Sequence, residues 1–357
     1  MIGCQKNNDF FEIYKEFYSA YPSELIRTND GGFMIVGWGR SLNNHNSNNG
    51  IAIKLDSKGD RQWQKEYGSS KSFQKFKYAI SLDNGHYFLG GTKDNNVWIT
   101  KIDSFGNILL NKEFINNLPE SAESACYDSL NNSLFIIGNS SNSGIKTTFI
   151  YKINNNGELL NKTIINSNNY EKILSCNIDH SDSSIVLTGS KYIDSANGLD
   201  GLLMKINMEG NIIWRKVFGD TGGEVIWDSE IDYEGNYILS GTSTLSSSGS
   251  SAIIRKVDKN GQLLYAHYFE DFPYSGSKNI LKKSNDMFTV IGRSGNHSGH
   301  KDNKLLILNL NKDSTPNSHK IISKSIGIEG KLSIENNEGE ILVVGITNRR
   351  NIFKLKL

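Results

Sequence analysis

Cysteine is scarce in this sequence: the 357 residues include three, Cys4, Cys126 and Cys176. None of them belongs to a Cys-x-x-Cys pair, so the chain offers neither a disulfide framework nor the ligand spacing of a structural zinc site. Cys126 and Cys176 fall at nearly the same place in successive repeats of the chain. We therefore predict two buried free thiols there, with a bridge between them as the alternative.

Long apolar runs and an excess of charge of one sign are also missing. No segment approaches the roughly 18 apolar residues of a membrane-spanning helix. Lysine and arginine total 39 against 38 aspartate and glutamate, a net charge of +1, and no basic stripe stands out. The composition therefore gives no support to nucleic-acid binding or to electrostatic docking on a membrane.

The most informative pattern is a short apolar strand that ends in glycine and recurs seven times. The glycines stand at positions 37, 91, 138, 189, 241, 292 and 345, so successive gaps are 54, 47, 51, 52, 51 and 53 residues. A period near 50 residues is typical of propeller blades, in which each repeat is one small sheet that cannot bury its faces alone.

Each repeat divides into four expected strands joined by polar turns. Asn, Asp and Gly turns precede the apolar strand, as in Asn29–Gly32, and an Asp/Asn-x-x-Gly turn follows the third strand, as in Asp56–Gly59. Such turns favour tight hairpins. The sequence predicts an all-β, seven-bladed β-propeller with four-stranded antiparallel blades and a second strand buried on both faces.

The two ends of the chain predict how the ring closes. The last repeat stops at Ile352–Leu357, inside its third strand, and the N-terminal Ile13–Phe17 matches the fourth strand Trp63–Tyr67 position for position. We expect the N-terminal strand to complete the last blade, because closure removes exposed sheet edges. Residues 10–357 then form one propeller domain, and residues 1–9 form an N-terminal tail.

A ligand site is expected on the side of the ring that carries the irregular connections. Second-to-third-strand loops and inter-blade links share one side, and functional residues concentrate on variable loops held by a rigid scaffold. A ring of cations near the channel mouth could hold an anionic or hydroxyl-rich ligand. The candidate ligand-binding residues follow or lie close to the strand glycines: Trp38, Arg40, Lys93, Lys191, Arg293, Arg349 and Arg350.

Catalytic and metal-binding motifs give little support to an enzyme. No Ser-His-Asp, His-Glu-x-x-His or P-loop pattern is visible, and His297 and His300 lack a fixed third ligand. Strand alternation scatters the acidic side chains of one blade, Asp220, Glu224, Asp228 and Asp232. We predict no catalytic residue, no metal and no cofactor. The remaining tryptophans are expected to pack between sheets.

The N-terminus and the repeat together carry a resemblance to a known group. Residues 30–37 and 54–68 resemble the propeller repeats of secreted and lipid-anchored bacterial proteins, a similarity that spans residues 10–357. It implies a bacterial exported or cell-surface protein, mostly without a known reaction. Met1-Ile-Gly-Cys4 resembles the end of a lipoprotein signal, which makes Cys4 the expected lipidation site.

The repeat is also distantly similar to quinoprotein propellers, but no quinone site is expected. The similarity lies in a tryptophan that recurs in the repeat. In this chain Leu110, Tyr265 and Ser318 stand at that position in three of the repeats, and the chain lacks an adjacent cysteine pair. The predicted function is a non-catalytic exported binding or scaffold propeller that recognises a glycan, peptide or partner protein. It would be an outer-membrane or cell-surface lipoprotein, or periplasmic. The alternative is a polysaccharide hydrolase or lyase with a site at the central channel.

Overall fold

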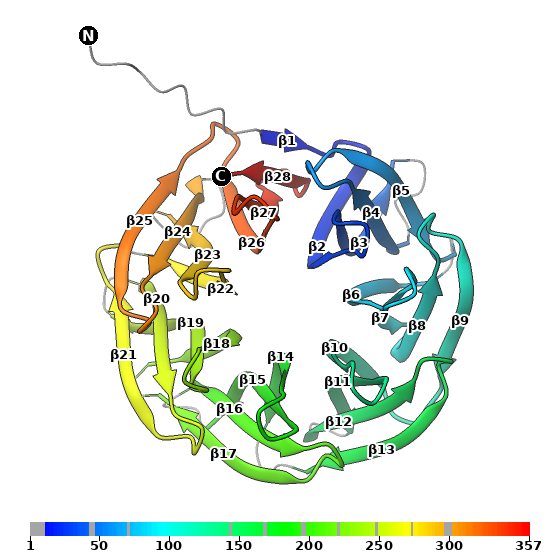
Figure 1. The fold of residues 1–357 in the computed structure, drawn as a ribbon, viewed down its shortest axis with the longest axis horizontal. Coiled ribbons are helices and arrows are strands. Elements are labelled where there is room, and N and C mark those ends of the chain that lie inside the picture. Colours follow the sequence, from blue (N-terminus) through cyan, green and yellow to red (C-terminus); the bar gives the residue numbers. More distant parts are fainter. Residues whose placement is uncertain are drawn as a thin grey trace.

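The computed structural model describes residues 11–42, 47–69, 72–142, 145–166, 170–193, 198–219, 222–246, 249–272, 274–295 and 302–357. These residues form seven four-stranded antiparallel sheets arranged as a closed ring around a central channel (Figure 1). The predicted seven-bladed β-propeller is confirmed.

Blades 1 to 4 follow one another along the chain. Their strands, from the channel outward, are β2 (Phe17–Arg27), β3 (Phe33–Ser41), β4 (Asn49–Leu55) and β5 (Arg61–Tyr67); β6 (Gln74–Ser81), β7 (Tyr87–Lys93), β8 (Asn96–Ile102) and β9 (Ile108–Phe114); β10 (Glu120–Asp128), β11 (Ser133–Asn142), β12 (Ile145–Asn154) and β13 (Leu159–Ile165); β14 (Glu171–Asp179), β15 (Ser184–Tyr192), β16 (Leu199–Asn207) and β17 (Ile212–Phe218).

Blades 5 and 6 repeat this order, and blade 7 takes its outer strand from the start of the chain. The strands are β18 (Glu224–Ile231), β19 (Tyr237–Ser246), β20 (Gly249–Val257) and β21 (Leu263–Phe269); β22 (Gly276–Lys282), β23 (Phe288–Ser294), β24 (Lys304–Leu310) and β25 (Pro316–Ile322); β26 (Ile328–Glu335), β27 (Ile341–Thr347), β28 (Ile352–Lys356) and β1 (Phe11–Ile13).

The core consists of apolar layers between neighbouring blades. Between blades 2 and 3, for example, Phe88 and Ile99 share one buried cluster with Ile136 and Phe149. The second strand of each blade is apolar at successive positions because both of its faces meet such a layer, as in the fully buried Phe33–Val36 of β3. The predicted burial on both faces is confirmed.

A β-bulge in every inner strand explains the seven recurring glycines. In blade 4 the register of β14 shifts between Ile173 and Ser175, and Gly189 pairs with Ile173. A Cβ built on Gly189 would collide with the backbone oxygen of Lys172. The other inner strands have bulges at the equivalent place, each opposite the repeat glycine of its blade. A bulge bends the strand and adds one unpaired residue, so each glycine accommodates a neighbour that has been pushed toward it.

The start of the chain closes the ring, as predicted. Strand β1 pairs antiparallel with β28, where Glu12 lies opposite Lys354 and Ile13 opposite Phe353. Lys354 Nζ also lies 2.9 Å from the Glu12 carboxylate. Closure therefore rests on a strand of three residues, whereas the outer strands of the other blades have seven.

The predicted register of that closing strand is wrong by three residues. Tyr14, not Phe17, takes the place of Tyr67, because its N–H donates to Ile352 at 2.9 Å where Tyr67 pairs with Gly50. Phe17 begins β2 and pairs with Ser41 in blade 1. A buried apolar side chain ends the outer strand in most blades, and Tyr14, 1% exposed, fills that place in blade 7.

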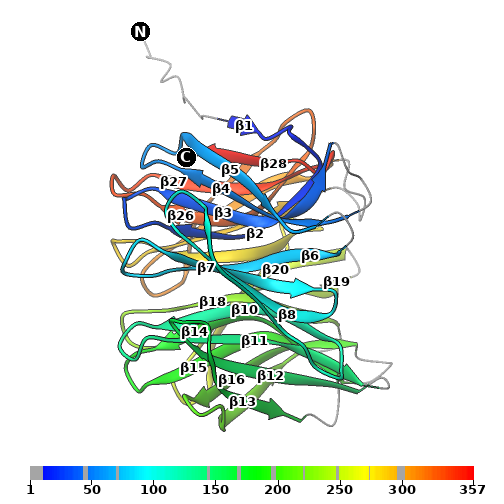
Figure 2. The same ribbon diagram turned by 90° about the vertical axis from the view of Figure 1, so that its right-hand side faces the viewer.

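The two sides of the ring differ in their connections (Figure 2). One side, called the short-turn face here, carries the first-to-second and third-to-fourth-strand turns. In one of these turns the Asp56 carboxylate accepts backbone N–H groups of Lys58 and Asp60 at 2.9 and 2.8 Å, and Gly59 has φ of 86°. The opposite side, the loop face, carries the second-to-third-strand connections and the links between blades.

Candidate ligand-binding site at the seam of the ring

Four of the seven predicted ligand-binding residues line a single cavity on the loop face. Trp38 and Arg40 at the end of β3 meet Arg349 and Arg350 of the β27–β28 turn around a volume of about 510 Å³. The cavity lies where blade 7 meets blade 1, a junction called the seam here, and we call it the seam pocket. Among the residues that the structure describes, its lining contains three arginines and no aspartate or glutamate.

Hydrogen bonds orient the Arg40 side chain and hold the backbone of the Arg349–Arg350 turn. Arg40 Nε donates to Asn48 Oδ1 at 3.2 Å, a bond that does not use its two terminal nitrogens. The carbonyl of Arg350 accepts the N–H of Ala20 in β2 at 2.7 Å, which ties the turn of the last blade to the first. Arg350 itself has φ of 59°, a left-handed conformation that closes the tight turn.

Aromatic rings form another wall of the seam pocket. Tyr21 stacks on Trp38 with ring centroids 4.3 Å apart, and Lys75 Nζ lies 4.4 Å from the centroid of the same indole. Tyr18, also in the lining, is 58% exposed. Sequence reasoning missed both tyrosines, because the inner strand of blade 1 was not assigned to residues 17–27. The remaining lining side chains, Ser19, Asn48 and Asn348, are polar and uncharged.

The other three predicted residues do not reach the seam pocket. Lys93 forms an ion pair with Glu113 in its own blade, and Lys191 lies 3.4 Å from the buried carboxylate of Glu171. Arg293, at the end of β23, pairs in register with Gly276 on the inner strand of blade 6. These cations lie on the loop face as expected, but two of them have acidic partners within the protein.

Further cations lie on the loop-face half of the inner strands, at or beside the bulges. Lys278 in β22 places its Nζ 2.9 Å from the centroid of Trp227, and Lys331 in β26 lies 2.5 Å from Glu329. Burial, followed by the charge of Lys331, lowers the pKa of Lys278 to about 6. Lys77, the bulge residue of β6, pairs with Glu123 at 3.1 Å.

Carboxyl groups occupy the deeper part of the channel, a cavity of about 440 Å³. Burial, followed by the charge of Asp228, raises the pKa of Glu24 to about 8. Burial likewise raises the pKa of Asp228, and that of Glu230 to about 7. All three side chains are half-buried, since the channel leaves them some access to solvent.

Asp228 links neighbouring blades through hydrogen bonds. Its two oxygens accept Ser175 Oγ of blade 4 at 2.9 Å and Asn279 Nδ2 of blade 6 at 2.8 Å. Asn279 in turn accepts the N–H of Ser333 in blade 7 at 2.8 Å. Glu24 accepts the N–H of its neighbour Leu25 at 3.2 Å.

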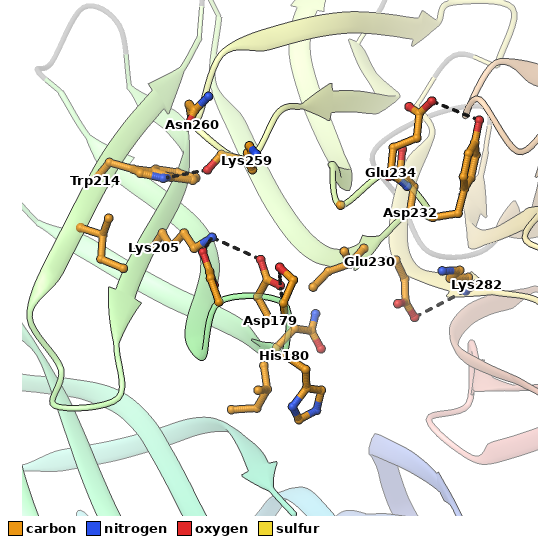
Figure 3. Close-up of a pocket in the computed structure, with 18 residues that line it drawn as sticks. Asp179, His180, Lys205, Trp214, Glu230, Asp232, Glu234, Lys259, Asn260 and Lys282 are labelled. Atoms are coloured by element: carbon orange, nitrogen blue, oxygen red, sulfur yellow. Dashed lines mark hydrogen bonds and ion pairs between the residues drawn. The ribbon is translucent and has the colours of Figure 1, made fainter. Parts of the chain in front are cut away.

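A further cavity, of about 990 Å³, opens on the short-turn face between blades 4 and 5 (Figure 3). Its principal charged groups are paired internally. Lys205 bonds Asp182 at 2.6 Å and Asp179 at 3.2 Å, and Trp214 donates its indole N–H to the carbonyl of Lys259 at 3.1 Å. These side chains therefore hold neighbouring turns together, and we do not assign a ligand to this cavity.

Other predicted features have mixed outcomes. Cys126 and Cys176 are buried free thiols, as predicted. Glu224 binds Arg255 at 2.7 Å and Asp232 binds Lys256 at 2.9 Å, so blade 5 uses these acids in ion pairs. Cys4, Asp220, His297 and His300 lie outside the described residues. Within the described part of the chain, no group of three or more His, Cys, Asp or Glu side chains is placed to hold a metal ion.

Comparisons with known proteins support the architecture alone. The chain is similar to the WD40 domain of Neurospora crassa Pan2 (TM-score 0.62, 9% identity, 98% of this chain and 95% of that chain). It is similar to Sqt1 from Chaetomium thermophilum (TM-score 0.57, 8% identity, 96% and 99%) and to a puromycin hydrolase (TM-score 0.54, 10% identity), covering 92% of this chain but 58% of that one. No protein-family model matches the chain, and no curated protein matches it. No helix among the described residues has the length and apolarity to cross a membrane.

Proposed function

We propose that this chain is a non-catalytic binding propeller that holds an anionic ligand in the seam pocket on its loop face. The observation that carries the proposal is the described lining of that pocket, in which three guanidinium groups stand without a carboxylate. Guanidinium groups bind planar oxyanions through paired hydrogen bonds. The ligand would be a glycan, a peptide or a surface of a partner protein that presents such a group.

Stabilisation by simple anions tests this function directly. Citrate and sulfate should raise the melting temperature of the protein more than chloride does at equal ionic strength, because a ligand that binds only the folded state stabilises it. The extra shift should vanish in the double variant Arg40→Gln/Arg349→Gln and persist in Lys58→Gln, which removes an exposed cation from the short-turn face. Equal shifts in all three proteins would contradict a specific site.

The proposal extends to an exported, bacterial, lipid-anchored protein, supported by the resemblance of the repeat and of the sequence around Cys4. A lipid on Cys4 would anchor the propeller without a membrane-spanning segment. Incorporation of labelled fatty acid into the protein, and its loss in Cys4→Ser, is the expected result. Labelling that survives this substitution would contradict lipidation at Cys4.

A second candidate function is the cleavage of a polysaccharide at the channel, either by hydrolysis or by the elimination reaction of a lyase. Glu24 favours it, because a carboxyl group with a pKa near 8 stays protonated at neutral pH, as a general acid requires. Against it, Asp228 is engaged by neighbouring blades on both oxygens. The chain's similarity to a puromycin hydrolase supports the fold and carries no catalytic residue across.

Product formation from a panel of polysaccharides separates the two candidates. A hydrolase or lyase would release reducing ends or unsaturated sugars, and Glu24→Gln would abolish that release. A binding propeller would retain the panel members without cleaving them.

A further inference from the structure

The chemistry of the seam pocket narrows the class of ligand. Three arginines line a concave site in which the described part of the chain places no compensating acid, and Lys75 adds a fourth cation beside Trp38. Like charges held together in a hollow repel one another unless an anion occupies it. The pocket volume of about 510 Å³ lies within the range of small-ligand sites.

The uncharged part of the lining points to hydroxyl groups on the same ligand. Ser19, Asn48 and Asn348 bring hydroxyl and amide groups to the cavity that holds the arginines. Asn48 is 5% exposed and is already oriented by its bond to Arg40. Precisely placed polar side chains of this kind give a small-ligand site its orientation and specificity. A ligand that combines carboxylate and hydroxyl groups would satisfy both parts of the lining.

The surroundings of Trp38 do not favour a nucleic acid. Single-stranded nucleic acids bind by stacking bases on open aromatic faces. Tyr21 stacks on Trp38 at 4.3 Å and Lys75 lies 4.4 Å from the centroid of its ring, so both groups compete with a base for this indole. The chain's net charge of +1 also provides no general attraction for a phosphate backbone.

We propose that the seam pocket binds an acidic polysaccharide, with the carboxylate of a uronate residue held between Arg40 of blade 1 and the Arg349–Arg350 turn of blade 7. The ring hydroxyls of the same sugar meet Asn48, Asn348 and Ser19, and Tyr18 covers the sugar ring from the exposed side. This inference rests on the proposed function and specifies its ligand.

Calorimetric titration of the full chain with four probes tests the ligand class. The probes are a galacturonate hexamer, its fully methyl-esterified form, hexaglutamate and a thymidylate hexamer. The uronate hexamer should bind, and the ester should bind about tenfold more weakly or worse, because esterification removes the charge that the arginines recognise.

Substitutions of single cations test whether the uronate hexamer binds in the seam pocket. Arg40→Gln should weaken the uronate hexamer about tenfold or more, and Arg349→Gln, at an exposed turn position, provides a second variant that leaves the core untouched. Lys58→Gln, on the other face, should leave the affinity unchanged. A melting curve of each variant confirms that it is folded.

The outcomes separate this inference from the function on which it rests. If hexaglutamate or thymidylate binds more tightly than the uronate and depends on Arg40, the glycan assignment is overturned and the anion site stands. If the ester binds as well as the acid, the carboxylate contact is overturned. If no acidic probe binds in a way that depends on Arg40 or Arg349, both the inference and the proposed function fail.

Discussion

Ser314 shows at the level of one residue how a blade departs from its repeat. It occupies the place that glycine takes in the corresponding turns of blades 1 to 5, and its φ is 73°. Its hydroxyl group is buried and has no hydrogen-bond partner among the described residues. A non-glycine residue in this conformation is strained, and a buried hydroxyl group without a partner adds a desolvation cost.

Ser314→Gly should therefore raise the free energy of unfolding by about 1 kcal/mol, since relief of strain exceeds the added flexibility of the unfolded chain. Gly261→Ser, at the equivalent turn of blade 5 with φ of 82°, should lower it by a similar amount. Urea denaturation of both variants measures the two effects. A destabilised Ser314→Gly protein would show that the serine contributes something the turn geometry does not reveal.

The raised pKa values in the channel predict how stability depends on pH. Glu24 and Glu230 hold protons in the folded state to higher pH than in the unfolded chain, with pKa values of about 8 and 7. Their contribution to stability is complete below the unfolded pKa near 4.5 and is lost as the pH rises toward 8. We expect the free energy of unfolding to fall between pH 5 and pH 8 and Glu24→Gln to reduce that fall.

Glu209→Gln is the control for this pH effect, because Glu209 is exposed in a turn on the short-turn face. Its substitution should leave the difference between the free energies of unfolding at pH 5 and pH 8 unchanged. If Glu24→Gln and the parent protein lose the same stability over this interval, the carboxyl group of Glu24 is ionised in the folded protein.

At the level of single strands, the pairing of glycine with a bulge makes the repeat intolerant of a methyl group. In Gly189→Ala the new Cβ would collide with the backbone oxygen of Lys172 in the neighbouring strand β14, so the paired backbones of β14 and β15 would have to move apart. The expected loss is about 2 kcal/mol or more. Gly235→Ala provides a comparison, since nothing lies within 4 Å of its Cβ and its cost should come from its φ of 82° alone.

Thermal and urea unfolding of these two glycine variants gives the comparison. Hydrogen exchange of β14 and β15 should accelerate in Gly189→Ala and remain unchanged in Gly235→Ala. Equal losses of stability in the two variants would mean that the close approach at the bulge is not what requires glycine.

The buried aromatic ring of Tyr14, and not its hydroxyl group, is what we expect to stabilise the closing strand. Tyr14 is 1% exposed, and its hydroxyl group is buried with no hydrogen-bond partner in the part of the chain that the structure describes. Tyr14→Ala should cost about 3–5 kcal/mol through the cavity it leaves between blades 7 and 1. Tyr14→Phe should be neutral or stabilising, because it removes only the unsatisfied hydroxyl group. Urea denaturation measures both, and a destabilised phenylalanine variant would contradict this account.

Sequence periodicity predicted the strands and blades because two signals repeat: apolar strands ending in glycine and Asx turns. It misplaced the closing strand, because Ile13–Phe17 resembles Trp63–Tyr67 in side-chain type while the buried ring that sets the register is Tyr14. The bulges were not predicted either, since the extra residues have no common chemistry: Ser23, Lys77, Glu123, Leu174, Trp227, Lys278 and Lys331.

The candidate site was only partly predictable for a related reason. Proximity to the strand glycines correctly placed seven side chains on the loop face, but only three-dimensional closure brings Arg349 beside Arg40. The ion pairs that engage Lys93 and Lys191 depend on cross-strand register, which a single sequence does not specify.

For the whole molecule, Phe11 at the start of β1 lies beside the C-terminal strand β28 on the short-turn face, where other blades have a hairpin turn (Figures 1 and 2). A circular permutant should therefore fold, with a short turn joining Leu357 to Phe11 and new termini between Asn117 and Leu118, in the link between blades 2 and 3. Its melting temperature should equal or exceed that of the parent, because the join makes closure covalent. Circular dichroism and melting curves test this, and a permutant that fails to fold would contradict the closure geometry.

Because the seam pocket lies between the first and the last blade, a bound ligand should affect the mechanical stability of the ring. A ligand bound by both Arg40 and Arg349 would link blade 1 to blade 7. Without a ligand, the three-residue strand β1 closes the ring at this place. An occupied propeller would then resist unzipping from its ends, under pulling or proteolysis, better than an empty one.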